Sequence, residues 1–532
     1  MQSVDSALTM AAGVRPWTNL AVRGRKLRPF ARISASLCAL AIAIAGEAAR
    51  ADVKLPNIFS DHMVLQQGQK NKVWGTADAG EMITVTIDKQ KHTATAGADG
   101  KWQATLDPLA VGGPYVLNVQ GKNSKATISD VLSGEVWICS GQSNMQWWVR
   151  TSNDPDLEKR AAKFPKIRMI NFPNVGTQEP IWTHDKNKWM VCSPDTVSDF
   201  SAVGYFFARQ LHETLEVPIG MINNAWGGSA CEAWIRRDLL AADEKYQPLM
   251  DRWAMMEAQV AELSKKTDPD EEQTKKLNGL RGQMAGNARP GNIYNGVLKS
   301  HIGYGIRGAI WYQGESNAGR AYQYRDLFPL MIKNWRDEWG QGDFPFYWVQ
   351  LADFLAEKSE PGESAWAELR EAQTMTMAKL SNTGEAVIID IGEGKDIHPK
   401  NKVDVGRRLA RWALAKDYKI DIPYHSPQYK SMEKQGNKIV LTFDYVDGGW
   451  RPFDVNEPRG FAIAGEDKKF VWATAKILPD GRIEVASEKV EDPAAVRYGW
   501  ADNPVVNMYN QAGLPLTPFR TDDWPGVTAE AK

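Results

Sequence analysis

Four apolar runs in this sequence end in small or polar residues that could do chemistry. The first run leads into CSGQSNMQWW, residues 139–148, which holds Ser143. The later runs end in further small and polar residues: Gly227 and Gly228, Gln313 and Glu315, and Asp396 and His398. A serine, a histidine, carboxylates and glycines are together the parts of an acyl-transfer site.

Each residue type answers a need of serine chemistry. A serine hydroxyl is a weak nucleophile unless a base takes its proton, and imidazole suits that task near neutral pH. We therefore expect Ser143 to be the nucleophile and His398 the base. The oxyanion needs donors, because charge develops on the carbonyl oxygen during attack. The backbone amides at Gly227 and Gly228 and the side-chain amide of Gln313 are the candidates.

Two carboxylates compete to orient the imidazole. Asp396 lies two residues before His398, so both side chains can face the same way in an extended loop. Glu315 lies in another loop that should reach the same edge of the sheet, and it stays an alternative. For the base itself, His62 is the rival, although it lies in a β-rich region. A thiol hydrolase centred on Cys139 is a further interpretation.

Aromatic and amide side chains beside these residues are candidates for contact with a substrate. The chain has 21 tryptophans, and Trp17 is the one in the N-terminal leader. Most tryptophans are expected to pack in the core, because large aromatic rings bury much apolar surface. The residues expected to contact substrate are those closest to the proposed site: Gln142, Asn144, Trp147, Trp226, Trp311 and Asn317.

The elements that must position these residues follow from hydrophobic periodicity. Residues 52–130 alternate apolar and polar residues between Gly-containing turns, which predicts an N-terminal β domain. Residues 131–418 alternate strand-like runs with helical patterns, which predicts a parallel α/β sheet covered on both faces. A helical insert is expected at about 241–285. Residues 419–532 return to β structure and are expected to pack on the α/β core.

The β-rich regions at the two ends show few alternating apolar positions. We therefore expect too little apolar surface for two independent cores, so that both regions dock on the α/β domain. No Gly/Ser-rich or Pro-rich linker separates them from it.

The N-terminal 51 residues have the features of a signal peptide. A basic stretch at 23–32 precedes a short apolar segment at 33–45 and an A-x-A-like cleavage site before Asp52. The apolar segment is too short to span a bilayer, which needs about 20 residues. Export to the periplasm or the medium is therefore expected, with no membrane span.

Charge and cysteine content limit the partners. The leader carries seven basic and two acidic residues, so its removal changes the formal net charge from −1 to −6. A mildly acidic exported protein is not expected to bind nucleic acid. Cys139, Cys192 and Cys231 remain after cleavage, and either one disulfide with a free thiol or three thiols would fit. No cysteine or histidine spacing matches a metal site, and no cofactor is expected.

Six stretches of the sequence resemble the sialate O-acetylesterase family, a branch of the SGNH hydrolases. They are SDHMVLQ, GEVWICSGQSNMQW, NAWGGSACEAWI, IRGAIWYQGESNA, DIHPKNKVDVGRRLA and NMYNQAGLPLTPFRTD, and they extend along nearly all of the chain after the leader. The resemblance implies a flavodoxin-like SGNH core with flanking β regions. It also implies that Ser143 is the nucleophile and His398 the base. The oxyanion donors would be the Ser143 amide, the glycines at 227–228 and the Gln313 side chain.

One position departs from the family pattern. The acid of an SGNH site usually lies three residues before the histidine, where this chain has Lys395. The resemblance implies an O-acetylated carbohydrate substrate, either a sialic acid ester or a plant polysaccharide such as xyloglucan or xylan. The sequence does not separate these substrates, and it does not indicate an oligomeric state. The alternative function is a carbohydrate-binding protein of the same fold without catalysis.

Overall fold

The computed structural model describes residues 52–531. The expected signal peptide, residues 1–51, lies outside these described residues. Within them the central feature is a sheet whose strands follow one another in the order β13-β12-β11-β7-β10-β8-β9. The bounds are β7 (Lys125–Gly141), β8 (Phe164–Asn171), β9 (Met190–Cys192), β10 (Ile219–Asn223), β11 (Gly308–Tyr312), β12 (Phe346–Val349) and β13 (Thr383–Ala386). All pairs are parallel except β8 with β9, which confirms the predicted α/β core.

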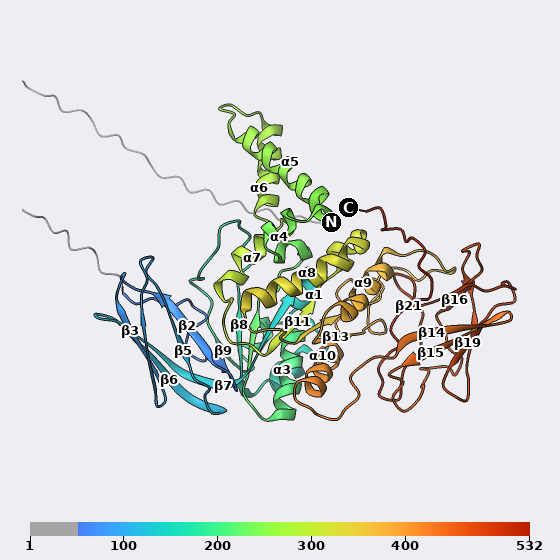
Figure 1. Cartoon of the computed structure of the whole chain (residues 1–532), viewed down its shortest axis with the longest axis horizontal. Coiled ribbons are helices and arrows are strands. Elements are labelled where there is room, and N and C mark those ends of the chain that lie inside the picture. The colour runs from blue at the N-terminus through green and yellow to red at the C-terminus, as the bar shows by residue number, and fades with distance from the viewer. Residues whose placement is uncertain (1–51, 532) are drawn as a thin grey trace, which may run out of the picture. The chain divides into compact units, whose positions relative to one another are not determined.

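Helices cover both faces of this sheet, as Figure 1 shows. The helices α3 (Ala202–Leu215) and α10 (Lys402–Lys416) pack together on one face, and α8 (Ala321–Trp339) and α9 (Ala365–Lys379) pack together on the other. Side chains alternate along β7, so that Trp137 joins the first layer and Ile138 the second. Because both faces are buried, the central strands β10, β11 and β12 are buried at every position and mostly apolar, as the sequence indicated.

The N-terminal β region is continuous with the core through β7. Strands β1 (Val64–Gln66), β3 (Met82–Ile87), β4 (Gln90–Thr95) and β6 (Gly112–Gln120) belong to the same sheet, and β2 (Asn71–Thr76) pairs with β5 (Lys101–Leu106). β6 pairs with the first half of β7, and β10 and β11 pair with its second half. The expected domain boundary at 130/131 therefore falls inside one strand. Apolar residues of this region share one core with those of α8.

The C-terminal β region has two four-stranded antiparallel sheets. One contains β14 (Gln428–Gln435), β15 (Lys438–Asp444), β18 (Thr474–Ile477) and β19 (Ile483–Ala486). The other contains β16 (Phe461–Ala464), β17 (Val471–Trp472), β20 (Ala495–Tyr498) and β21 (Phe519–Arg520). The two sheets enclose a separate hydrophobic core that includes Ile439, Ile463 and Val496. The expectation of too little apolar surface was wrong for this region, because apolar residues outside the regular strands, such as Met508 and Leu516, complete its core.

Buried polar contacts join this region to the α/β core. The guanidinium of Arg370, on α9, is fully buried and donates to the backbone oxygens of Ala501 and Asp502 at 2.6 and 2.9 Å. The carboxylate of Glu368 accepts hydrogen bonds from the backbone amides of Val527 and Thr528. The region therefore packs on the core through specific hydrogen bonds.

The remaining helices lie in connections between strands. The expected insert contains a hairpin of α5 (Gln247–Ser264) and α6 (Glu271–Met284), visible as a pair of helices in Figure 1. Asp270 caps α6 by accepting from the Gln273 amide. The short helices are α1 (Ser143–Gln146), α2 (Pro155–Ala161), α4 (Arg237–Ala241) and α7 (Asn292–Gly296). Among residues 52–531, no helix has the length and the apolar character needed to cross a membrane.

Candidate active site

Ser143 lies where the central strand β7 ends. β7 has β10 on one side and β11 on the other, and both of these strands come later in the chain. In open α/β sheets, ligands bind at this kind of switch in strand order, beyond the carboxyl ends of the strands. Gly141 ends β7 with φ +134°, and a Cβ there would lie 2.1 Å from the carbonyl oxygen of Tyr312. Glycine is therefore required by the neighbouring backbone.

The structure brings Ser143 and His398 together. His398 Nε2 is 2.8 Å from Ser143 Oγ, although 255 residues separate them in the chain. The indole ring of Trp147 stacks on the imidazole, with 4.7 Å between ring centroids and 11° between planes. The Trp147 indole N–H donates to the carbonyl oxygen of Thr151 at 2.9 Å, which fixes the indole ring. The imidazole is thus held by stacking as well as by its contact with the serine.

The two candidate acids occupy different positions. Asp396 Oδ1 lies 3.5 Å from His398 Nδ1 and also accepts a 2.9 Å hydrogen bond from the His398 backbone amide. Within the described residues, no hydrogen bond or ion pair joins Glu315 to His398. Glu315 Oε1 instead accepts from Asn144 Nδ2 at 2.7 Å. Of the two carboxylates, Asp396 is the one next to the imidazole, at a distance longer than a good hydrogen bond.

Burial and charge set the protonation of these groups. Partial burial lowers the pKa of His398, the charge of Lys402 lowers it further, and Asp396 opposes both. A lowered pKa keeps the imidazole neutral and able to accept a proton near pH 7. Burial raises the pKa of the Glu315 carboxyl, which its hydrogen bond from Asn144 partly offsets.

Two of the candidate oxyanion donors, the glycine loop at 227–228 and the Ser143 amide, lie beside the serine side chain. A Cβ at Gly227 would lie 3.4 Å from Ser143 Cβ, so this loop lies directly beside the serine. The Gly227 amide donates to Gln146 Oε1 at 2.7 Å, whereas Gly228, at φ +72°, is exposed. The Ser143 amide begins α1 and so has no partner within that helix.

Gln313 does not fit the donor role expected for it. Its side chain is fully buried, and Nε2 donates to the Ser229 oxygen at 3.1 Å and to Asn317 Oδ1 at 2.7 Å. Both amide hydrogens are therefore engaged within the protein. The Tyr324 hydroxyl donates to its Oε1 at 2.9 Å, which completes a buried network behind the site.

Four of the six residues expected to contact substrate have buried side chains in the structure: Gln142, Asn144, Trp311 and Asn317. Gln142 Oε1 accepts from the amides of Gly314 and Ser316. Trp311 is 0 % exposed and packs edge-on against Trp234. Trp147 and Trp226 remain partly exposed beside the serine and the glycine loop.

Sequence reasoning missed three side chains that support the site. Gln146 accepts from the Gly227 amide, and Asn287, which follows the helical hairpin, donates to the Gly227 carbonyl oxygen. Lys402, the first residue of α10, donates to Asn144 Oδ1 at 2.6 Å. A signal for Lys402 was present, since it lies three and seven residues before Val405 and Leu409, on the buried face of that helix.

The rival nucleophile and the rival base lie in other surroundings. Cys139, Cys192 and Cys231 are free and buried, which selects the three-thiol alternative. Burial raises the pKa of the Cys139 thiol far above its usual range, and this disfavours the thiolate that a thiol hydrolase needs. His62 Nδ1 pairs with Asp130 Oδ2 at 2.7 Å, away from Ser143.

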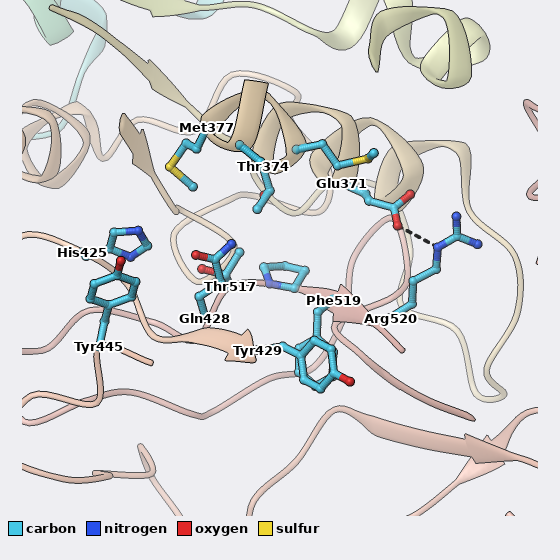
Figure 2. A pocket seen from close by; sticks show the side chains of 13 residues that line it. Glu371, Thr374, Met377, His425, Gln428, Tyr429, Tyr445, Thr517, Phe519 and Arg520 are labelled. Atoms are coloured by element: carbon cyan, nitrogen blue, oxygen red, sulfur yellow. Dashed lines mark hydrogen bonds and ion pairs between the residues drawn. The ribbon is translucent and has the colours of Figure 1, made fainter. Parts of the chain in front are cut away.

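A cavity of about 470 Å³ lies at a different place, between α9 and the C-terminal β region. Figure 2 shows it, with Glu371 and Arg520 joined at one side and His425 stacked on Tyr445 at the other. None of the predicted site residues lines this cavity. The chemistry expected from the sequence belongs to the edge of the sheet and not to this cavity.

Comparisons with known proteins agree with this arrangement. A family described as carbohydrate esterase, sialic acid-specific acetylesterase, matches residues 133–264 and 287–415. The chain is 27 % identical to the sialate O-acetylesterases of Mus musculus and Homo sapiens, over 90 % and 89 % of this chain and 96 % and 94 % of theirs. A crystal structure of a carbohydrate acetylesterase from Xanthomonas citri is 38 % identical, with a TM-score of 0.77, over 89 % of this chain and 100 % of that one.

Proposed function

Because the chain belongs to the sialate O-acetylesterase family and is a carbohydrate O-acetylesterase, we propose that it works by an acyl-enzyme mechanism carried by Ser143, His398 and Asp396. The 2.8 Å contact between Ser143 Oγ and His398 Nε2 is the observation that carries this proposal. It supplies the nucleophile and its base in one hydrogen bond. Asp396 is the proposed orienting acid, since it lies next to His398 Nδ1.

In the first half of the reaction, Ser143 Oγ attacks the acetyl carbonyl carbon while His398 takes the serine proton. The negative charge that forms on the carbonyl oxygen is stabilised by the Ser143 amide and by the Gly228 amide, since the Gly227 N–H donates to Gln146. The bond between the carbonyl carbon and the sugar oxygen then breaks, and His398 gives its proton to that sugar oxygen. An acetyl-serine and a free hydroxyl on the sugar result.

The second half repeats the chemistry with water. His398 takes a proton from water as the water oxygen attacks the acetyl-serine carbonyl. When the tetrahedral intermediate collapses, the Ser143 oxygen leaves and takes the proton back from His398, which releases acetate. The Asp396 carboxylate stabilises the imidazolium in both halves.

Replacing the nucleophile tests the mechanism. Ser143→Ala should fold normally and lose acetate release by about 10³-fold or more. Ser152→Ala is a matched control, because Ser152 is buried nearby and donates only to the Val149 carbonyl oxygen. A Ser143→Ala variant within tenfold of wild type on 4-nitrophenyl acetate would exclude Ser143 as the nucleophile.

We propose an O-acetylated carbohydrate as the substrate, with two candidates for its identity. Curated relatives are named for sialate esters, whereas the Xanthomonas citri relative is named only for carbohydrate. The partly exposed rings of Trp147 and Trp226 offer faces for a sugar. Acetate release from acetylated sialic acid, xylan and xyloglucan separates the candidates, and sugar binding without turnover would favour the non-catalytic alternative.

We also propose that the chain is exported, on the strength of the leader pattern in residues 1–51. The measurement is the N-terminal sequence of the protein recovered from the periplasm or the medium. We expect it to begin at Asp52. Recovery of the protein in the cytoplasm with an uncleaved N-terminus would contradict export.

A further inference from the structure

One buried side chain connects the loops that carry the two proposed catalytic groups. Lys402 is 0 % exposed, and its Nζ donates to Asn144 Oδ1 at 2.6 Å. Asn144 in turn donates through Nδ2 to Glu315 Oε1 at 2.7 Å and to the carbonyl oxygen of Ile397 at 2.9 Å. Asn144 follows the serine directly and Ile397 precedes the histidine directly. A single amide therefore joins the serine and histidine segments, and the lysine fixes that amide.

The direction of the hydrogen bonds depends on the lysine. An ammonium group donates only, so the Asn144 atom that faces Lys402 must be the carbonyl oxygen. The amide nitrogen of Asn144 then points to Glu315 and Ile397, where it meets two acceptors. Without the lysine the Asn144 oxygen would be buried without this donor, and only the two acceptors of Nδ2 would hold the amide.

The side chain of Lys402 is buried although it carries a charged group. Taking an ammonium group out of water costs about several kcal/mol, and only well-placed hydrogen-bond and charge partners offset this cost. The carboxylates that face it are Glu315, Glu393 and Asp396, and the ring of Tyr312 lies 5.2 Å from Nζ. Burial lowers the pKa of Lys402 to about 7, and these three carboxylates oppose the shift.

The charge of this lysine acts on the histidine in the acidic range. Below pH 7 Lys402 is mostly ammonium, because its pKa is about 7. In that range an imidazole would also begin to take up a proton. The charges that act on His398 are Lys402, which lowers its pKa after burial does, and Asp396, which raises it.

On these contacts we propose that Lys402 is a positioning residue for the reaction: it holds Asn144 so that the serine and histidine segments stay in register, and its buried positive charge favours the neutral, proton-accepting form of His398. This inference rests on the proposed function of Ser143 and His398. In this role neither Lys402 nor Asn144 contacts the substrate or its acetyl group.

The proposal fixes the sign of a pH effect. Activity requires neutral His398, so it falls as the pH drops through the pKa of that imidazole. Loss of the Lys402 charge raises that pKa, because a neighbouring positive charge no longer disfavours the imidazolium. The acidic limb of kcat/KM should therefore move to higher pH.

The test is Lys402→Met, with Arg407→Met as the matched control. Arg407 is an exposed cation of the same helix, so its loss removes the same charge outside the site. We expect Lys402→Met to lose kcat/KM by about 10²-fold, mainly in kcat, because a displacement of about 1 Å at the reacting groups has that effect. Its acidic limb should move to higher pH, whereas Arg407→Met should keep the wild-type profile.

A second variant tests the proposal if Lys402→Met fails to fold. Lys402→Met leaves Glu315 as a buried charge without this cation, so Lys402→Met with Glu315→Gln removes both charges at once. This double variant should regain thermal stability relative to the single variant and still show the acidic limb at higher pH. A folded variant of either kind with the wild-type limb would overturn the proposal.

The wild-type enzyme gives an independent measurement. The rate at which diisopropyl fluorophosphate inactivates Ser143 should follow deprotonation of His398, with an apparent pKa below the ordinary histidine value of 6.5. An apparent pKa at or above 6.5 would overturn the charge effect. The proposed function and the proposed role of Lys402 are tested by different variants. Activity in Ser143→Ala contradicts the proposed function, whereas inactive Ser143→Ala with an unshifted Lys402→Met profile contradicts only the role of Lys402.

Discussion

The serine loop and the histidine loop reach the same site but are held in different ways. The serine loop, residues 139–148, leaves the central strand of the sheet, and neighbouring strands and buried side chains such as Gln142 fix it on both sides. The histidine loop, residues 392–400, follows the edge strand β13 and is largely half-exposed. Its supports come partly from the C-terminal β region. Asn503 Nδ2 lies 2.7 Å from where a Cβ on Gly394 would be, and the Tyr509 hydroxyl donates to Asp390 Oδ2 at 3.1 Å.

This difference indicates which part of the fold positions each group. The sheet determines where Ser143 lies, because Ser143 follows the end of β7 by two residues and β7 is held between β10 and β11. The base depends on a region more than a hundred residues later in the chain. We therefore expect the proposed site to need the C-terminal β region, even though that region has no residue in the proposed triad.

The largest expected effect comes from removing that support. A fragment ending at residue 418 loses two acceptors of the buried Arg370 guanidinium, the backbone oxygens of Ala501 and Asp502, and the Tyr509 contact with Asp390. Leaving buried polar donors without acceptors costs about 1–3 kcal/mol each, and more for a charged group. We expect the 52–418 fragment to be insoluble or without esterase activity, measured by thermal unfolding and acetate release. A soluble, cooperatively folding and fully active fragment would show that the histidine loop supports itself.

Asp396→Asn tests whether the Asp396 carboxylate orients the His398 imidazole. An amide cannot accept the imidazole N–H in the same way, and amidation of a buried triad aspartate costs about 10⁴-fold in kcat. Because Asp396 is 39 % exposed and 3.5 Å from Nδ1, we expect a smaller loss, of about 10³-fold. Asp396 raises the pKa of His398, so its neutralisation should move the acidic limb to lower pH.

The control for this variant is Asp404→Asn, a partly exposed carboxylate at the start of α10. It should leave both kcat and the pH profile unchanged. A shift of the Asp396→Asn limb to higher pH would mean that Asp396 does not act on the imidazole through its charge.

Gly141→Ala tests the serine loop through the backbone. Its Cβ would meet the Tyr312 carbonyl oxygen at 2.1 Å, and φ +134° is strained for alanine. We expect a loss of stability of about 1–3 kcal/mol and of kcat/KM by about 10²-fold. Gly319→Ala is the control, because nothing lies within 4 Å of a Cβ there. Wild-type activity in Gly141→Ala would show that the serine loop is less constrained than the histidine loop.

The smallest effect should come from Glu315→Gln. The amide keeps an oxygen for Asn144 Nδ2 and removes only a charge that makes no contact with His398 in the described residues. We expect kcat/KM to fall by about tenfold or less, and by less than in Asp396→Asn. If Glu315→Gln is the more damaging variant, Glu315 orients the histidine and the proposed triad is wrong.

The sequence predicted the parts of the fold and site that follow from local pattern. Buried parallel strands are recognisable as apolar runs, so the strands ending near Ser143 and Gly227 were found, whereas β13 ends at Ala386, well before His398. The direction of a side chain at a loop is not a local property. Trp311 lies in the apolar strand β11 and Gln313 follows it, so both looked available, yet packing of α8 against β11 buries them.

Long-range partners set the limit in the other cases. Asn144 looked like a substrate contact because it adjoins the serine, but Lys402, 258 residues later, takes its carbonyl oxygen. The separate C-terminal core was also missed, since Met508 and Leu516 lie in irregular segments without a period of two. The boundary at 130/131 was predicted from a change in composition, which carries no information on whether a strand such as β7 continues across it.

The uninterrupted course of β7 limits how this protein can be recombined. A gene junction near codon 131 would divide one 17-residue strand between two parents. The first half would then meet a foreign β6 and the second half a foreign β10 and β11. Chimeras among relatives should tolerate exchange of the C-terminal β region, with its own core, more often than exchange of the N-terminal one. Inheritance of the first 90 residues after the leader should therefore be tied to inheritance of the catalytic serine.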